Sequence, residues 1–369
     1  MTTPGVTTPG VTSRYAATRA EIATMLESMG APKYRVDQVY DGLWSKRTAL
    51  DDLTSLPKAL RADLEQALPL ALAPATTQTS SDGATTKWLW QTADGAQIET
   101  VLMGSPERAT VCVSSQAGCA MGCTFCATGQ AGFERHLDAG EIVEQVVRAQ
   151  HATEQRVSHV VFMGMGEPLA NLDPVCAALE RLNTDFGISA RHLTVSTVGV
   201  VPGILRLATF DLPVTLAVSL HAPDDELRET LVPLNHRYPI SAVVDAARDY
   251  AAIKGRRVTF EYACIEGVND HLEQADRLAG RIRGLRGGAH VNLIPLNPTG
   301  DFAGQPPDRE RINRFAARLA AQGVTVTVRR NRGVDIDAAC GQLRARETQN
   351  RDKPAPGRAS GAGSATMVP

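Results

Sequence analysis

The sequence predicts an α/β protein whose core is a partial, TIM-like (βα)6 barrel. Three observations support this fold class. From residue 111 onward, short apolar strands alternate with amphipathic helices, which is typical of parallel βα units. Six such strands are too few to close a standard eight-stranded barrel, so the barrel is expected to be partial. Ahead of them, residues 15–75 follow a helical period and residues 76–110 carry hairpin signals.

The helical part is predicted to be a small accessory domain over residues 15–75. Apolar residues recur there at helical spacing, as Ile22 and Leu26 do, and Gly30 offers a C-terminal stop. Before this domain, residues 1–14 repeat the sequence TTPGV. Such a segment has too few apolar residues to build a core, so we expect a disordered leader.

Residues 76–110 are predicted to form a β-hairpin region. Two Asp-Gly pairs, which begin at Asp82 and Asp94, favour tight turns between strands. In the strand that follows, Glu99 alternates onto one face, and the next strand carries Cys112. If these two strands pair, Glu99 and Cys112 face the same cavity.

Residues 111–345 are predicted to form the barrel core, and residues 346–369 a disordered tail rich in Gly, Ala, Pro and Ser. In parallel barrels the chemistry lies at the C-terminal ends of the strands. The segments after the predicted strands supply glycine, small hydroxyls, one His, one Glu and one Asn, which suit a small polar ligand. They contain Gly166, Glu167, Ser196, Ser219, Leu220, His221 and Asn297.

The polar residues at these strand ends also have ordinary structural explanations. Glu167 can be a solvated loop residue, Ser196 can cap a helix, and His221 can be a satisfied buried histidine. Asn297, which precedes a proline, can start a turn. The functional interpretation is favoured because all of them fall at the same end of successive predicted strands as a cysteine-rich loop.

That loop follows the first barrel strand, reads GCAMGCTFCATG and contains Cys119, Cys123 and Cys126. Zinc motifs commonly combine two C-x₂-C pairs, and no second pair follows here. Cubane iron–sulfur clusters take thiolate ligands, and three cysteines on one short loop can reach three corners of the cube. An iron–sulfur cluster is therefore favoured over zinc, with its fourth iron open to a non-protein ligand.

The composition limits the possible partners and compartments. A formal net charge of −2 does not predict bulk affinity for nucleic acid or membrane, so RNA binding would need local basic clusters such as Lys33 with Arg35. There is no run of 18 apolar residues and no signal peptide, which indicates a cytoplasmic protein without a membrane partner. Seven cysteines in such a chain indicate metal or redox chemistry rather than a disulfide scaffold.

The cysteine loop and the MGMGEP segment at 163–168 resemble motifs of the radical S-adenosylmethionine (radical SAM) superfamily. Met165 occupies the first position of that family's Gly-Gly-Glu-Pro-type loop, which is a mild departure. The resemblance implies a radical SAM barrel with one [4Fe-4S] cluster on the three loop cysteines. It also implies that SAM binds the open iron and that the reduced cluster cleaves it to a 5′-deoxyadenosyl radical.

Residues 15–345 as a whole are similar to the RlmN-type dual-specificity adenine-C2 methyltransferases of 23S rRNA and tRNA. The helical domain, the strand-end loops and the ACGQLR ending around Cys340 match in order. By position, the resemblance implies that Cys340 carries the methyl group and that Glu99 accepts a proton. It implies that Cys112 resolves the enzyme–RNA adduct through a transient disulfide with Cys340. The strand-end residues would be contacts to SAM, of which two molecules serve each turnover.

The substrates implied by the resemblance are an adenosine of the peptidyl-transferase region of 23S rRNA and the adenosine 3′ of certain tRNA anticodons. An electron donor such as flavodoxin or ferredoxin is implied too, and residues 15–75 are expected to dock RNA. Two alternatives stay open. One is the related adenine-C8 methyltransferase of the antibiotic-resistance type, which shares the cluster and the carrier. The other is a zinc-stabilised RNA-binding protein without catalysis.

Overall fold

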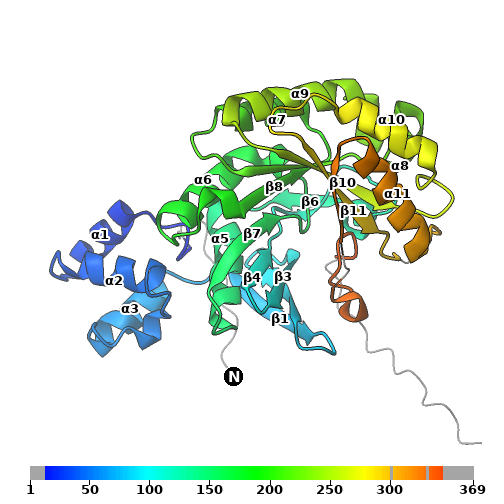
Figure 1. Ribbon diagram of the computed structural model, residues 1–369. Helices are drawn as coiled ribbons and strands as arrows, with labels where there is room; N and C mark the ends of the chain where they lie inside the picture. The colour runs from blue at the N-terminus through cyan, green and yellow to red at the C-terminus, as the bar shows by residue number, and fades with distance from the viewer. Residues whose placement is uncertain (1–12, 300–301, 330–331, 344–369) are drawn as a thin grey trace, which may run out of the picture.

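The computed structural model describes residues 13–299, 302–329 and 332–343 (Figure 1). The predicted disordered tail lies outside the described residues, as does the predicted leader except for its last two positions. Of these, Arg14 is buried: its Nε donates to the carbonyl of Leu68 at 3.0 Å, and its guanidinium pairs with Glu65. Arg14 is therefore part of the folded protein, although it falls within the segment predicted as leader.

A small helical module begins the described chain and is drawn in blue beside the barrel in Figure 1. Thr18 starts its first helix with a capping box to Glu21, which satisfies two free backbone groups at once. Arg181 of the barrel donates to the carbonyl oxygens of the segment before this helix and fixes the module to the core. The module consists of α1 (Arg19–Ser28), α2 (Arg35–Trp44), η1 (Leu50–Asp52) and α3 (Lys58–Ala67).

An antiparallel meander follows, with turns at the two predicted Asp-Gly pairs. Gly83 and Gly95 have φ values of +68° and +92°. Glycine adopts such positive φ values readily, whereas residues with a Cβ atom rarely do. The first strand begins at Leu72, earlier than the predicted boundary at 76. The meander consists of β1 (Leu72–Thr79), β2 (Thr85–Thr92), β3 (Gln97–Ser105) and β4 (Arg108–Cys112).

From β4 onward the neighbouring strands of the main sheet are parallel, as the alternation of strands and helices predicted. Their order in the sheet is β4-β7-β8-β9-β10-β11-β12, which is also their order in the chain. The strands after β4 are β7 (Val157–Phe162), β8 (Leu193–Thr197), β9 (Thr215–Ser219), β10 (Val258–Cys264), β11 (Ala289–Pro295) and β12 (Thr325–Val328).

The connecting helices form the outer layer around these strands (Figure 1), and their apolar faces pack against buried Val, Ile and Leu of the sheet. They are α5 (Ala139–His151), α6 (Leu172–Thr184), α7 (Val201–Thr209), α8 (Asp225–Leu231), α9 (Ile240–Lys254), α10 (Leu272–Ile282) and α11 (Arg309–Ala321). Short 3₁₀ turns, η2 (Pro168–Asn171), η3 (Ala190–His192), η4 (Pro233–His236) and η5 (Val334–Ile336), complete the connections.

The barrel stays open between its last parallel strand and the meander, and residues 332–343 run along this opening, which we call the seam. Arg332 Nη1 donates to the carbonyl of Gly104 in β3 at 2.7 Å. Lys87 Nζ of β2 donates to the carbonyl of Asp337 at 3.2 Å. The segment that carries Cys340 is thereby tied to the meander as well as to the barrel.

Candidate active site

A small two-stranded sheet, which the sequence did not predict, holds the ends of the cysteine loop. It pairs β5 (Gln116–Gly118) with β6 (Phe133–His136), and α4 (Ala127–Ala131) lies between them. Cys119 N donates to the carbonyl of Gly132 at 2.7 Å. Gly118 has φ +74°, and a Cβ on it would lie 2.1 Å from the same carbonyl oxygen. Only glycine fits this position, so the loop needs the glycine that precedes its first cysteine.

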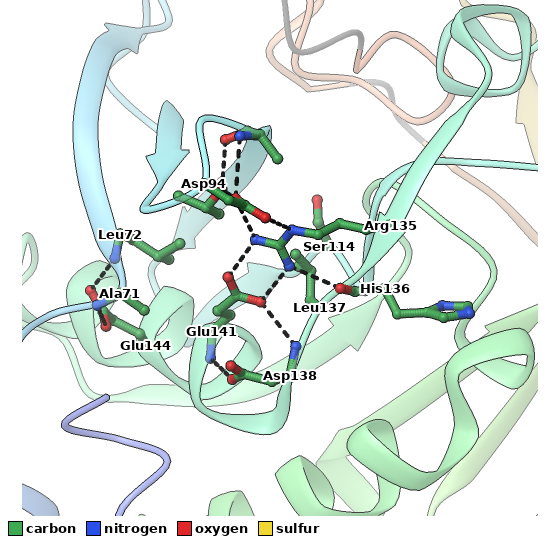
Figure 2. Close-up of polar contacts among 12 residues, drawn as sticks. Ala71, Leu72, Asp94, Ser114, Arg135, His136, Leu137, Asp138, Glu141 and Glu144 are labelled. Carbon is green, nitrogen blue, oxygen red and sulfur yellow. Dashed lines mark hydrogen bonds and ion pairs between the residues drawn. The ribbon is translucent and has the colours of Figure 1, made fainter. Parts of the chain in front are cut away.

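A charged cluster on the outer side fixes β6 to its neighbours (Figure 2). Arg135 of β6 joins Asp94 in the β2–β3 turn, at 2.5 Å, to Glu141 of α5, at 2.7 Å. Glu141 also completes a capping box with Asp138 at the start of α5. Glu144, one helical turn further, accepts hydrogen bonds from the backbone of Ala71 and Leu72 as β1 begins. The support of the cysteine loop thus spans three separate elements.

Cys119, Cys123 and Cys126 line one cavity of about 140 Å³, which we call the loop cavity. Burial raises the pKa of the Cys119 thiol to about 12 and that of Cys123 well above its usual range. Cationic iron would relieve this unfavourable burial of thiolates. Within the described chain, no three His, Cys, Asp or Glu side chains are arranged around a single metal ion. A four-iron cluster does not need that arrangement, because each thiolate binds a different iron.

The MGMGEP segment crosses the floor of the loop cavity close to the backbone of β4 and β5. A Cβ on Gly164 would lie 2.7 Å from the Val113 carbonyl oxygen, and one on Gly166 would lie 2.5 Å from Gln116 Cβ. Met165 points into the core and is 2% exposed, which explains why a large side chain is tolerated at this position. The glycines here are therefore required by close packing.

Glu167 lines the loop cavity and is buried. Its carboxylate accepts hydrogen bonds from the backbone N–H groups of Leu169, at 3.0 Å, and Val198, at 2.8 Å. Burial outweighs these bonds and raises its pKa to about 7. A buried carboxylate of this kind is suited to a cationic ligand group such as an amine.

His221, at the end of β9, lines the loop cavity in a strained backbone conformation with φ +62°. Its Nδ1 accepts a hydrogen bond from the backbone N–H of Ala263 at 3.0 Å, so the neutral ring carries its proton on Nε2. Burial lowers its pKa to about 3, which keeps the ring neutral. Phe125 of the cysteine loop packs edge-on against it, with ring centroids 4.8 Å apart.

Ser196 and Ser219 also line the loop cavity from the ends of β8 and β9. Leu220 does not line it: its side chain is fully buried in the core, and only its backbone lies next to the site. Six of the seven strand-end residues singled out in the sequence thus meet at one cavity.

Arg228 of α8 is a residue that sequence reasoning missed, and it is fully buried. Its guanidinium donates to the carbonyl oxygens of Val198 at 2.6 Å, Ser219 at 3.3 Å and Leu220 at 3.1 Å. These carbonyls belong to the ends of β8 and β9, so Arg228 fixes the two strand ends relative to each other. Nothing in the local sequence distinguishes it from an exposed helical arginine.

The Cys340 segment docks on the far wall of the loop cavity. Asn297 Nδ2 donates to the Cys340 carbonyl at 3.0 Å, and the backbone N–H of Ala127 donates to the Gly341 carbonyl at 2.8 Å. Asn297 Oδ1 is buried and has no hydrogen-bond partner among the described residues. Because this oxygen lies at the cavity wall without a donor from the described residues, it can accept a hydrogen bond from a bound ligand, such as one from a hydroxyl or amino group of SAM.

Cys340 also lines a second cavity of about 450 Å³ beside the seam, which we call the seam cavity. Cys112 lies in its wall, opposite Val101 in the β3–β4 register. This confirms the predicted pairing of the two strands, which places Glu99 and Cys112 on one face of the sheet. Burial raises the pKa of Cys112 to about 12, and the surroundings of the sulfur raise that of Cys340 to about 11, although Cys340 as a whole residue is exposed. Both thiols are free, as are the other five cysteines.

Glu99 has a partner that the sequence did not reveal. Its carboxylate forms a buried ion pair with Lys87 Nζ of β2 at 3.0 Å. In the described chain Glu99 lines neither cavity, so the prediction that it faces the same cavity as Cys112 is wrong: its carboxylate turns to Lys87 instead. Lys87 also donates to the carbonyl of Asp337, three residues before Cys340, so the ion pair lies next to the Cys340 segment.

The three loop thiols, the buried strand-end glutamate and the open parallel barrel fit the radical SAM enzymes, and comparison with known proteins shows that this chain belongs to that class. Residues 113–279 match the Radical SAM superfamily. The fold superposes on the crystal structure of a radical SAM methyltransferase from Sphaerobacter thermophilus with a TM-score of 0.85. That protein shares 50% sequence identity over 90% of this chain and 99% of its own.

Curated relatives show to which family within the radical SAM enzymes the chain belongs. The probable dual-specificity RNA methyltransferase RlmN of Parafrankia sp. (strain EAN1pec) is 53% identical over 89% of this chain and 90% of its own length. The protein of the same name from Picosynechococcus sp. (strain ATCC 27264 / PCC 7002 / PR-6) is 48% identical over 88% and 93%. The chain belongs to the RlmN family of radical SAM RNA methyltransferases.

Membership of this family confirms the predicted fold class and the predicted cofactors, a [4Fe-4S] cluster and SAM. Family membership also excludes the alternative of a non-catalytic zinc protein, because the members of this family are enzymes of the transferase class. Within the residues that the structure describes, none of the helices has the length and apolar character needed to cross a bilayer.

Proposed function

We propose that the protein methylates carbon 2 of adenosine in two RNAs, the peptidyl-transferase region of 23S rRNA and the position 3′ of certain tRNA anticodons. The dual-specificity name of its relatives supports two RNA substrates, and a cytoplasmic location follows from them. The observation that carries the proposal is the position of Cys340, which lines both the loop cavity and the seam cavity. A thiol in that position can receive a group on one side and deliver it on the other.

The loop cavity is the proposed cofactor site. Cys119, Cys123 and Cys126 would hold the [4Fe-4S] cluster through three of its irons. When bound, the reduced cluster supplies the electron that cleaves SAM and so generates a radical able to remove a hydrogen atom. An electron donor such as flavodoxin or ferredoxin would provide that electron. The proposed SAM contacts are Gly166, Glu167, Ser196, Ser219, Leu220, His221 and Asn297; the six that line the loop cavity support this assignment, and Leu220 can contribute only its backbone.

The proposed methyl path runs through two cysteines and one carboxylate. The Cys340 thiolate takes the methyl group of a first SAM and carries it as a thioether, and a second SAM supplies the radical that activates it. The activated carbon would add to adenine C2, the adduct would return one electron to the oxidised cluster, and Glu99 would accept the proton that leaves C2. The Cys112 thiolate would then attack the Cys340 sulfur, so that a disulfide forms, the bond between this sulfur and the transferred carbon breaks, and the carbon takes up a proton to leave methylated RNA. The shared cavity of Cys112 and Cys340, and the place of Glu99 on the same sheet face, support these roles.

We also propose that the domain of residues 15–75 docks RNA, ahead of the hairpin region of 76–110 and the catalytic core of 111–345. Two of its basic residues form hydrogen bonds within the protein, since Arg35 donates to the Ser55 carbonyl and Arg47 to the Phe186 carbonyl. Lys33 is exposed, and its neighbour Tyr34 is 56% exposed. An exposed aromatic ring beside a cation suits the stacking of an unpaired base.

The test is mass spectrometry of nucleosides after anaerobic incubation of the reconstituted enzyme with tRNA, SAM and a reductant. We expect 2-methyladenosine, and both Cys340→Ala and Cys119→Ala should abolish it. An 8-methyladenosine product would show that the protein is the C8 enzyme instead. Methylation that persists without Cys340 would remove the carrier from the scheme.

A further inference from the structure

The seam cavity extends well below the two cysteines and reaches the opposite end of the strands. Its wall follows β4 from Cys112, where the strand ends, down to Arg108, where it begins. At ~3.3 Å per residue, this wall is roughly 13 Å deep, close to the length of one nucleotide from base to phosphate. The cavity contains none of the three loop cysteines, so it is separate from the place proposed for the cluster.

The upper part of the seam cavity is mostly apolar and the lower part is polar. Around Cys112 and Cys340 most walls are aliphatic or thioether side chains, which suit the faces of a planar ring, and the Arg329 guanidinium lies beside them. Towards the start of β4 the walls offer hydroxyls, an imidazole and the guanidinium groups of Arg108 and Arg332. The apolar walls are Val101, Met103, Val161, Met163 and Ile294, and the polar ones are Ser105, Arg108, Thr110, His159, Thr194, Thr327, Arg329 and Arg332.

The charged side chains that line this cavity are all positive. None of the described residues that line it is Asp or Glu, whereas three are arginines, in a chain with a formal net charge of −2. Arg108 and Arg332 are exposed at the mouth, and Arg332 donates to the Gly104 carbonyl through Nη1. Arg329 is half-buried deeper inside; among the described residues it makes no ion pair, although its charge acts to lower the pKa of Glu261, which lines the loop cavity. Unpaired guanidinium groups around a cavity favour an anionic ligand, phosphate above all.

We propose that the seam cavity binds the target nucleotide of the RNA, with the base against Cys112 and Cys340 and the phosphate on Arg108 and Arg332 at the mouth. This inference rests on the proposed function and adds to it the place where the RNA enters. Arg329 lies near both thiols, since its charge acts to lower the pKa of each. It can donate to a ring nitrogen or stack on the base there.

The test uses adenosine 5′-monophosphate as the probe and the two thiols as reporters, and it does not depend on methylation. Anaerobic holoenzyme is alkylated with N-ethylmaleimide, and the rates at Cys112, Cys340 and Cys176 are followed by peptide mass spectrometry. The nucleotide should slow alkylation of Cys112 and Cys340 severalfold, and adenosine should need a higher concentration. Cys176, half-buried on α6, should react at an unchanged rate and reports an intact fold.

Arg108→Gln and Arg332→Gln should each raise the nucleotide concentration for half-protection on the order of tenfold, the effect of one charge-assisted hydrogen bond, without changing that for adenosine. Arg191→Gln is the matched control, because Arg191 is exposed in η3 and does not line the cavity. If neither the nucleotide nor adenosine slows alkylation of Cys112 and Cys340, the proposed binding site is wrong. Protection that is indifferent to both arginines, or equally sensitive to Arg191, overturns the phosphate assignment. Failure of the proposed function would show separately, as unmodified tRNA with wild-type enzyme.

Discussion

The side chain of Asn297 donates a hydrogen bond to the carbonyl oxygen of Cys340 at 3.0 Å. Asn297 follows β11 and lines the loop cavity, whereas Cys340 lines both cavities, so one amide ties the cofactor side to the carrier. The other end of the amide, Oδ1, is buried without a protein partner. Asn297 can therefore link a ligand in the loop cavity to the Cys340 segment, the proposed methyl carrier.

Replacement of Asn297 by Asp removes the donor and puts a negative charge against the Cys340 carbonyl. We expect methyl loading of Cys340 from SAM to slow by roughly tenfold, in keeping with the loss of one buried hydrogen bond. Intact-protein mass spectrometry over time measures the loading. Asn183→Asp is the control, because Asn183 also bonds a backbone carbonyl, that of Ile188, but lies away from the site. Equal slowing in both variants would contradict a specific role.

Gly118→Ala should abolish cluster binding. The added Cβ would lie 2.1 Å from the Gly132 carbonyl oxygen, and φ +74° adds backbone strain, so β5 must separate from β6. Iron content and visible absorbance after anaerobic reconstitution measure the outcome. Gly83→Ala is a matched control, since Gly83 has φ +68° with open space around it. It should retain iron and lose only about 1 kcal/mol of stability. Full iron occupancy in Gly118→Ala would contradict the structure.

SAM should bind more tightly as the pH rises from 6 to 8. Burial places the pKa of Glu167 at about 7, so its carboxyl is mostly protonated at pH 6 and mostly ionised at pH 8. Only the ionised form attracts the amino group of SAM, and the ionised fraction rises roughly tenfold over this interval. Equilibrium binding to the reconstituted enzyme measures the effect. Glu167→Gln should bind weakly and lose this dependence; an unchanged pH profile in the variant would assign the titration to another group.

Cys112→Ala should accumulate a covalent enzyme–RNA adduct if Cys340 is methylated beforehand. The variant can still bond the activated methyl carbon to the base, but it lacks the thiol that releases the product. Denaturing gel electrophoresis with labelled tRNA measures the adduct. Cys176→Ala, outside both cavities, should turn over normally. Normal turnover by Cys112→Ala would exclude the proposed resolving role.

Tyr34→Ala should weaken tRNA binding by on the order of tenfold, which is typical of the loss of one stacked base. SAM cleavage without RNA should be unaffected, because Tyr34 belongs to the helical module and lines neither cavity. A filter-binding or anisotropy titration measures the affinity. Ile253→Ala removes a comparably exposed apolar side chain, 61% exposed, from α9 and should change nothing.

Much of the fold and most of the candidate site could be predicted because their signals are local. The alternation of strands and helices, the Asp-Gly turns and the polar residues after each strand all lie within short windows of sequence. The shared face of Glu99 and Cys112 followed from strand alternation once the strands were taken to pair, and the register Val101↔Cys112 bears this out.

Features that depend on distant contacts could not be predicted. Arg228 gains its role from the carbonyls of two other strand ends, and Lys87 from an ion pair across the meander. The β5–β6 pair is too short to show a periodic pattern, and its strands lie on either side of the cysteine loop. The carrier segment offers no periodic signal either, since its position depends on hydrogen bonds to the cysteine loop and to Asn297.

The Cys340 segment is held by hydrogen bonds to its main chain and by the Gln342 side chain, which donates to the Pro298 carbonyl at 3.1 Å. The carbonyl oxygens of Cys340, Gly341 and Leu343 accept hydrogen bonds from Asn297, Ala127 and Thr128, and none of these bonds involves the Cys340 sulfur. The anchorage is thus indifferent to what the sulfur carries. In the proposed scheme the same anchorage would therefore serve the free thiol, the methyl thioether and the adduct with RNA, and the segment would not have to detach between them.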